Sequence, residues 1–194
     1  KNTEEEEIEV RKSVIAVVPS SLLLWCCTLI SDATNTNSNS KISISATVMA
    51  TGNKMSCTLL ASLPNNTIPT ILADMKCMTN GDLFVVVSIA TAIAVELHAF
   101  QIQYNQQNST ISNVATTKIN LTNVATINSL TLSKVQHNLC VILGITSSNI
   151  NTTTKTSSTL VQCYTIDIKE GTNNIRFIKP ASKNVSNNLN SSTN

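Results

Sequence analysis

The feature that most constrains this chain is a two-residue alternation of apolar and hydroxyl-bearing side chains. Residues 41–50 read KISISATVMA, in which Ile42, Ile44, Ala46 and Val48 occupy every second position. Successive side chains of a β-strand point to opposite faces, so this period places the apolar set on one face and Ser and Thr on the other. Shorter alternating runs recur along the sequence, which therefore predicts a sheet protein.

The composition supports the same prediction. The 194 residues include 24 Asn, 26 Thr and 23 Ser, and the apolar residues are mainly Val, Ile, Leu and Ala. Branching at Cβ restricts χ1 and favours strands over helices. Because 42% of the residues are hydrophobic and only 12% are charged, most of the chain is expected to fold. We predict an all-β, antiparallel β-sandwich, Ig-like or jelly-roll-like, with an extended N-terminal arm.

Composition also suggests four segments. They are an N-terminal arm or strand segment (1–33), a polar linker (34–40), the β-sandwich domain (41–180) and a polar C-terminal tail (181–194). In the first segment, an acidic start precedes two expected strands, 8–18 and 22–30, which are separated at Pro19. The alternative is a membrane segment over residues 14–30, although a spanning helix needs about 20 apolar residues and Pro19 interrupts this one.

Turn-forming residues indicate where several further strands begin and end. Asn80 and Gly81 predict a hairpin, and residues 170–173 predict another between strands at 164–168 and 175–178. The apolar run 83–100 is expected to be one central strand buried on both faces, with a membrane helix as the alternative.

Residues 111–130 contain the tetrapeptide NVAT twice, ten residues apart. Repeat architectures need about three units, and no third copy follows. We expect two similar amphipathic strands, paired antiparallel and turning near Asn120.

The six cysteines form no C-x-x-C pair, and His137 with Cys140 supplies only half of a zinc site. An even number of cysteines without metal spacing favours disulfides in an oxidising compartment, with six buried thiols in an intracellular protein as the alternative. We expect the pairs Cys57–Cys77 and Cys140–Cys163. Cys26 and Cys27 should point to opposite faces of one strand and need separate partners or stay free.

Six N-x-S/T sequons are candidate glycosylation sites: Asn65, Asn108, Asn120, Asn151, Asn184 and Asn190. A chain this rich in Asn, Ser and Thr produces about that many by chance, so the number alone carries no information. Asn65, Asn108 and Asn151 lie in polar stretches where a glycan could project.

Several function classes lose support from the sequence. The net charge is +2 and the basic residues are scattered, which argues against a nucleic-acid partner. The four glycines are far apart, so no phosphate loop, dinucleotide fingerprint or nucleophile elbow is present. Glu96 and His98 share a strand face without an evident third group, and we interpret them as surface or satisfied residues. We therefore expect no enzyme, no cofactor and no bound metal.

These observations favour a structural or adhesive subunit of an extracellular assembly, such as a surface filament or pilus-like fibre. It would form a homo-oligomer or polymer by strand complementation through Ile8, Val10, Val14, Ala16 and Val18, which share one face of the expected first strand. The alternatives are a viral capsid or spike subunit on the virion surface, and a single-pass membrane glycoprotein ectodomain acting as a receptor or accessory subunit.

Overall fold

The computed structural model describes residues 6–18, 21–32, 40–61, 63, 70–79, 81–91, 94–135, 138–147, 158–169 and 174–179. Within these residues the protein is all-β and antiparallel, as predicted, and its strands form three four-stranded sheets. The first sheet contains β1 (Glu6–Val18), β2 (Ser21–Asp32), β3 (Lys41–Val48) and β4 (Lys54–Leu60). The middle sheet contains β5 (Thr70–Cys77), β6 (Leu83–Ala90), β7 (Val95–Asn105) and β8 (Thr110–Leu121). The third contains β9 (Val124–Val135), β10 (Asn138–Ser147), β11 (Ser158–Lys169) and β12 (Asn174–Ile178).

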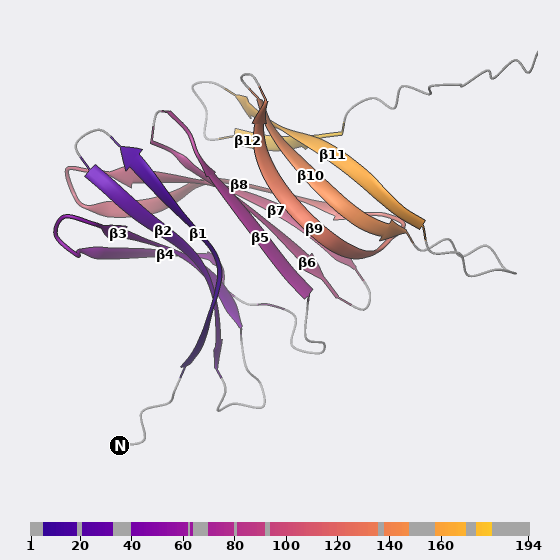
Figure 1. The fold of residues 1–194 in the computed structure, drawn as a ribbon, viewed down its shortest axis with the longest axis horizontal. Coiled ribbons are helices and arrows are strands. Elements are labelled where there is room, and N and C mark those ends of the chain that lie inside the picture. Colours follow the sequence, from indigo (N-terminus) through magenta and orange to yellow (C-terminus); the bar gives the residue numbers. More distant parts are fainter. Residues whose placement is uncertain are drawn as a thin grey trace, which may run out of the picture.

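The sheets are stacked as layers, with β5–β8 between the other two (Figure 1). Each sheet is a meander whose strands follow chain order. On one side of the middle sheet β1 packs against β5 and β4 against β8; on the other side β9 packs against β5 and β12 against β8. The sandwich thus has three layers, one more than Ig-like and jelly-roll sandwiches have.

The middle sheet is apolar on both faces because it borders two hydrophobic cores. In β6, Leu83, Val85 and Val87 belong to the core shared with the first sheet, whereas Phe84 and Val86 belong to the core shared with the third. This arrangement explains why residues 83–89 are all buried and, apart from Ser88, all apolar, and the expected burial on both faces is confirmed.

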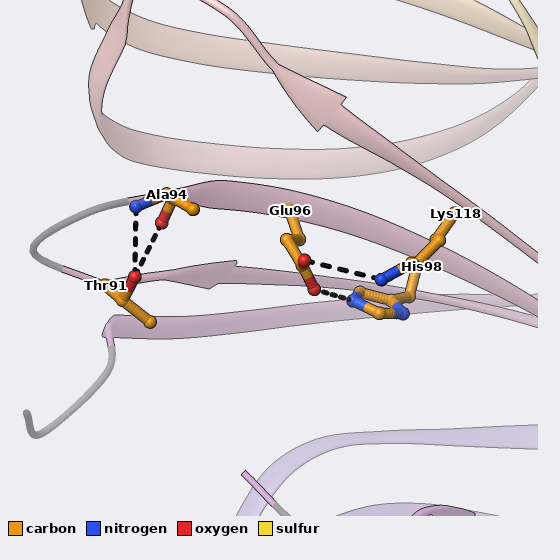
Figure 2. A network of polar contacts seen from close by, with 5 residues as sticks. All are labelled: Thr91, Ala94, Glu96, His98 and Lys118. Atoms are coloured by element: carbon orange, nitrogen blue, oxygen red, sulfur yellow. Dashed lines mark hydrogen bonds and ion pairs between the residues drawn. The ribbon is translucent and has the colours of Figure 1, made fainter. Parts of the chain in front are cut away.

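The run 83–100 nevertheless forms two strands and not the single strand expected. β6 ends at Ala90, β7 begins at Val95, and the two pair antiparallel. Figure 2 shows how Thr91 closes the turn: its hydroxyl donates to the Ala94 carbonyl at 3.0 Å and accepts from the Ala94 N–H at 3.1 Å. Neither Gly nor Pro lies between the strands, so no turn residue marked this boundary in the sequence.

Other expected elements are confirmed. The segments 8–18 and 22–30 correspond to β1 and β2, and the alternating run at 41–50 contains β3. The hairpin at Gly81, which has a φ of 90°, joins β5 to β6, and β11 pairs with β12 as predicted. β2 also pairs with β3, so β1 and β2 share the first sheet with β3 and β4. Linker residues 34–39 and the tail 181–194 lie outside the described residues.

The two strands of the NVAT repeat exist, but they do not form the expected hairpin. β8 pairs with β7, whereas β9 pairs with β10, so the two strands lie in different sheets. Only Thr122 and Asn123 separate them, and Asn123 adopts a left-handed φ of 60°. The chain uses this tight turn to pass from the middle layer to the third.

Candidate functional site: the edge and outer face of the first sheet

The N-terminal strand β1 is an edge strand with a bulge at Arg11. β1 pairs with β2 throughout its length, but the register shifts between Val10, opposite Thr28, and Lys12, opposite Cys27. A bulge inserts one unpaired residue and reverses the facing of the residues beyond it. The expectation that residues 8–18 keep one apolar face is therefore wrong.

Because of the bulge, the apolar residues of β1 face opposite sides of the sheet before and after Arg11. After it, Val14 and Ala16 pack into the core between the first and middle sheets. Before it, Ile8 and Val10 point outward and are 60% and 58% exposed. The side chain of Val18 lies outside the described residues. Residues that sequence reasoning missed, Ile15 and Val17, also point outward and are 60% and 81% exposed.

The outward-pointing residues of β1 and β2 form an apolar strip. On β2 the inward residues are Leu23, Trp25, Cys27 and Leu29, so the even-numbered residues face outward. The strip, defined as the outward residues of β1 and β2 between residues 8 and 30, consists of Ile8, Val10, Ser13, Ile15, Val17, Leu22, Leu24, Cys26, Thr28 and Ile30. None of these residues is charged. The run SVIAVV at 13–18, which has neither charge nor Pro, is the sequence signal that could have identified it.

The other half of the same outer face is polar. The outward residues of β3 and β4 include Ser45, Thr47, Ser56 and Thr58, with Lys54 at the start of β4. The first sheet therefore presents an apolar half along β1 and β2 and a hydroxyl-rich half along β3 and β4.

Two basic residues at the bulge fasten β1 to the middle sheet. The Arg11 guanidinium donates from Nη1 to the Ile71 carbonyl at 3.4 Å and pairs with Glu9 at 2.7 Å. The Lys12 ammonium lies 3.2 Å from Oδ1 of Asp74 on β5. Edge bulges commonly redirect side chains in this way. Arg11 and Lys12 are thus engaged with the middle sheet, whereas the outward residues Ile15 and Val17 remain exposed.

Asp74 connects all three sheets. Besides the Lys12 contact from the first sheet, its Oδ2 accepts the backbone N–H of Leu132 on β9 at 2.8 Å. Its Oδ1 also accepts the N–H of Met75 at 2.9 Å. The side chain of Asp74 is only 11% exposed, so these contacts offset the cost of burying its carboxylate.

A second polar network lies on β7 and β8 (Figure 2). The carboxylate of Glu96 accepts a hydrogen bond from His98 Nε2 at 2.8 Å, and Lys118 Nζ lies 3.5 Å from its other oxygen. Partial burial opposes ionisation of Glu96, but the His98 hydrogen bond and the Lys118 charge outweigh it and lower the pKa of the carboxyl group below 4.5.

His98 is buried and stacks on Phe100, with 6.3 Å between ring centroids. It is a satisfied residue, as the sequence indicated. The third group, Lys118, comes from the neighbouring strand, where sequence spacing could not reveal it.

The two expected disulfides are not formed: all six cysteines, each within the described residues, are free thiols. Cys57 lies in the first sheet and Cys77 in the middle sheet, on edge strands at opposite sides of the stack. Cys140 and Cys163 are diagonal neighbours, because Cys140 is opposite Thr165 and Cys163 is opposite Ile142. Diagonal positions are about 7–8 Å apart at Cα, beyond the usual disulfide range.

Cys26 and Cys27 face opposite ways, as expected. Cys27 is fully buried, and burial raises the pKa of its thiol to about 12. Cys26 is partly exposed on the apolar strip, with Sγ 3.9 Å from Ser13 Oγ.

Two of the six sequons lie in the described part of the chain. Asn108 is exposed in the turn after β7, where its N–H donates to the Asn105 side chain at 3.2 Å, and Asn120 is exposed near the end of β8. Asn65, Asn151, Asn184 and Asn190 lie outside the described residues, as does His137.

Among the residues that the structure describes, no helix has the length and apolarity that crossing a membrane requires. Residues 14–30, the candidate membrane segment, belong to β1 and β2 apart from residues 19 and 20, which are not described.

Comparisons of the chain with protein-family models, with curated proteins and with solved structures found no match. Functional inference for this protein therefore rests on its own residues and geometry.

Proposed function

We propose that this protein is a non-enzymatic structural or adhesive subunit of an extracellular assembly, and that it polymerises through the edge strand β1. One observation carries the proposal: the free edge of β1 ends in an uncharged run, residues 13–18, in which Val17 is 81% exposed. Native sheets usually protect such edges with charge, Pro or a covering element, because an unprotected edge pairs with other chains.

The four-stranded meander suggests how copies would join. β1 and β4 are the two edges of the first sheet, and consecutive strands of a meander alternate in direction. A copy translated sideways along the sheet would therefore bring its β1 antiparallel to β4 of its neighbour, which continues the sheet. Such head-to-tail contacts do not close, so they produce a filament. Four strands at about 4.8 Å give a subunit repeat of about 19 Å.

This mechanism uses residues 8–18 in place, paired with β2, and not as an arm donated to another copy. The anchoring of Arg11 and Lys12 on β5 supports the in-place form, since a donated arm would have to break both contacts.

We place the assembly outside the cell, at the cell surface or on a virion surface. The low charge of the chain and its hydroxyl- and amide-rich composition support this location, because such a surface suits a packed or glycan-covered exterior. Exposed Asn108 and Asn120 would be the glycan acceptors within the described residues.

The proposal is tested with the paired substitutions Ile15→Lys and Val17→Lys. Wild-type protein should form filaments in negative-stain electron microscopy, and the double variant should remain monomeric, because a charged edge opposes strand addition. Val161→Lys is the matched control: Val161 is 71% exposed but lies on β11, an interior strand of the third sheet, so filaments should persist.

A wild-type chain that stays monomeric, or a double variant that assembles normally, would contradict the proposal. Closed shells in place of filaments would favour the capsid alternative. Extraction from membranes only with detergent would favour the membrane ectodomain. Circular dichroism of each variant establishes that the sheet structure is retained.

A further inference from the structure

We infer that the outer face of the first sheet packs against the same face of a second copy, forming a two-fold symmetric face-to-face dimer. This contact uses the outer surface of the sheet, whereas the proposed filament contact uses the backbone edge of β1; the exposed residues Ile15 and Val17 belong to both regions. The observations that carry it are the polarity of the face, its area and its register.

The face already resembles an interface between layers. Within the molecule, neighbouring sheets pack through alternating apolar side chains, and the apolar strip continues this alternation on the outer side of β1 and β2. Ile15, Val17 and Leu22 are 60%, 81% and 42% exposed, although most apolar residues of the sheet are buried in the core. Contiguous exposed apolar surface of this kind marks an interaction site.

The area fits a second copy of the sheet. β1 has 13 residues and is therefore about 40 Å long, and four strands spaced about 4.8 Å apart are about 19 Å wide. Because β3 and β4 are shorter, the face has a footprint on the order of 600 to 800 Å². Standard stable interfaces bury about 800 Å² per partner, so the whole face is needed and the apolar strip alone is too small.

The polarity of the face determines the direction of the two-fold axis. An axis parallel to the strands would place the apolar half of one copy over the hydroxyl half of the other. An axis across the strands places β1 over β1 and β4 over β4, so that apolar surface meets apolar surface and hydroxyl meets hydroxyl. Burying apolar surface against its like is the favourable arrangement, and it selects the axis across the strands.

The register places small residues on that axis. Ser13 is opposite Cys26, Cys26 is opposite Ser45, and Ser45 is opposite Ser56. This row crosses the sheet near the middle of each strand, where overlap between the two faces is greatest. Residues on a two-fold axis meet their own copies, so each Cys26 should face the other. Small side chains along this row let the two sheets approach more closely than their usual spacing of about 10 Å, as a disulfide between the two Cys26 residues requires.

Cys26 therefore supplies a native cross-linking probe. Treatment with diamide, which accepts two hydrogens from a pair of thiols, should convert wild-type protein to a covalent dimer seen on a non-reducing gel. Peptide mapping should identify a Cys26–Cys26 link. Cys26→Ser should lower the yield at least about tenfold, whereas Cys163→Ser, which removes an exposed thiol of the third sheet, should not.

The same probe separates face packing from edge pairing. If copies joined only through β1, the two Cys26 residues would be three or four strand spacings apart, at least about 14 Å, which no disulfide can bridge. A covalent dimer through Cys26 in protein that forms no filaments would support the face contact and overturn the filament proposal.

A second variant keeps the inference falsifiable without oxidation. Leu22 lies on β2, away from the edge, so Leu22→Lys should raise the dimer dissociation constant at least about tenfold in analytical ultracentrifugation and leave filament growth intact. Val161→Lys should leave both unchanged. Wild-type affinity in Leu22→Lys together with no Cys26 link would overturn the inference.

Discussion

At the scale of single residues, burial gives chemically identical side chains different reactivities. Cys27 is fully buried, and its thiol pKa is raised from 9.0 to about 12, whereas Cys163 is exposed on the third sheet. The thiolate is the reactive form. The higher pKa lowers the thiolate fraction of Cys27 at pH 8 by roughly a thousandfold, and a reagent must also reach the site.

Thiol labelling at pH 8 should therefore follow a fixed order. Cys163 should react first with an aromatic disulfide reagent, and Cys27 should react only when the protein unfolds. Cys77, which is half-buried and has a pKa raised to about 11, should also be slow. Mass spectrometry of timed digests measures the order, and Cys163→Ser identifies the fast phase. Labelling of Cys27 as fast as Cys163 in folded protein would contradict the described packing.

At the scale of elements, the strands were predictable but their partners were less so. The period of two is local, so residues 41–50 revealed β3, and Gly81 revealed the hairpin between β5 and β6. The bulge at Arg11 was not visible, because it depends on how β1 meets β2 and β5. Its effect was to place Ile8 and Val10 on the outward face, opposite to Val14 and Ala16, with which they were expected to share a face.

The passage from β8 to β9 shows the same limit. A two-residue turn between similar amphipathic strands suits a hairpin within one sheet and equally suits a step between sheets. Burial decides which occurs: Ala115 and Leu121 of β8 and Ile127 of β9 all enter the core between the middle and third sheets. Strands that face one another across a core belong to different layers. That β8 and β9 belong to different layers follows only from the whole set of strands, because both apolar faces of β6 must be covered by a sheet.

The turn between β8 and β9 can be tested by substitution of Asn123. Asn123 has a φ of 60°, a conformation that Gly adopts freely, Asn tolerates and a β-branched residue resists. Asn123→Val should lower the free energy of unfolding by about 1–2 kcal/mol, whereas Asn123→Gly should be close to neutral. Urea denaturation followed by circular dichroism measures both. Equal midpoints for the two variants would mean that the turn does not constrain the step between layers.

At the scale of the molecule, three stacked sheets require the middle one to be apolar on both faces, which leaves few places for polar contacts between layers. Asp74 is such a place, since it contacts β1 through Lys12 and β9 through the Leu132 N–H. A buried carboxylate between layers gives a fixed relative position to sheets whose hydrophobic contacts alone tolerate some sliding. Its removal should therefore affect all three layers together.

Asp74→Ala should destabilise the protein by about 2–4 kcal/mol, because it leaves buried donors, including the Leu132 N–H, without an acceptor. Lys12→Met should cost less than about 1 kcal/mol, since the Lys12 side chain is 46% exposed and its ion pair is screened by solvent. Urea denaturation followed by fluorescence of Trp25, the single tryptophan, reports on the core between the first and middle sheets. Hydrogen exchange at Leu132 reports on the third. Faster exchange at Leu132 in Asp74→Ala but not in Lys12→Met is expected, and equal effects of the two substitutions would show that Asp74 acts only through its ion pair.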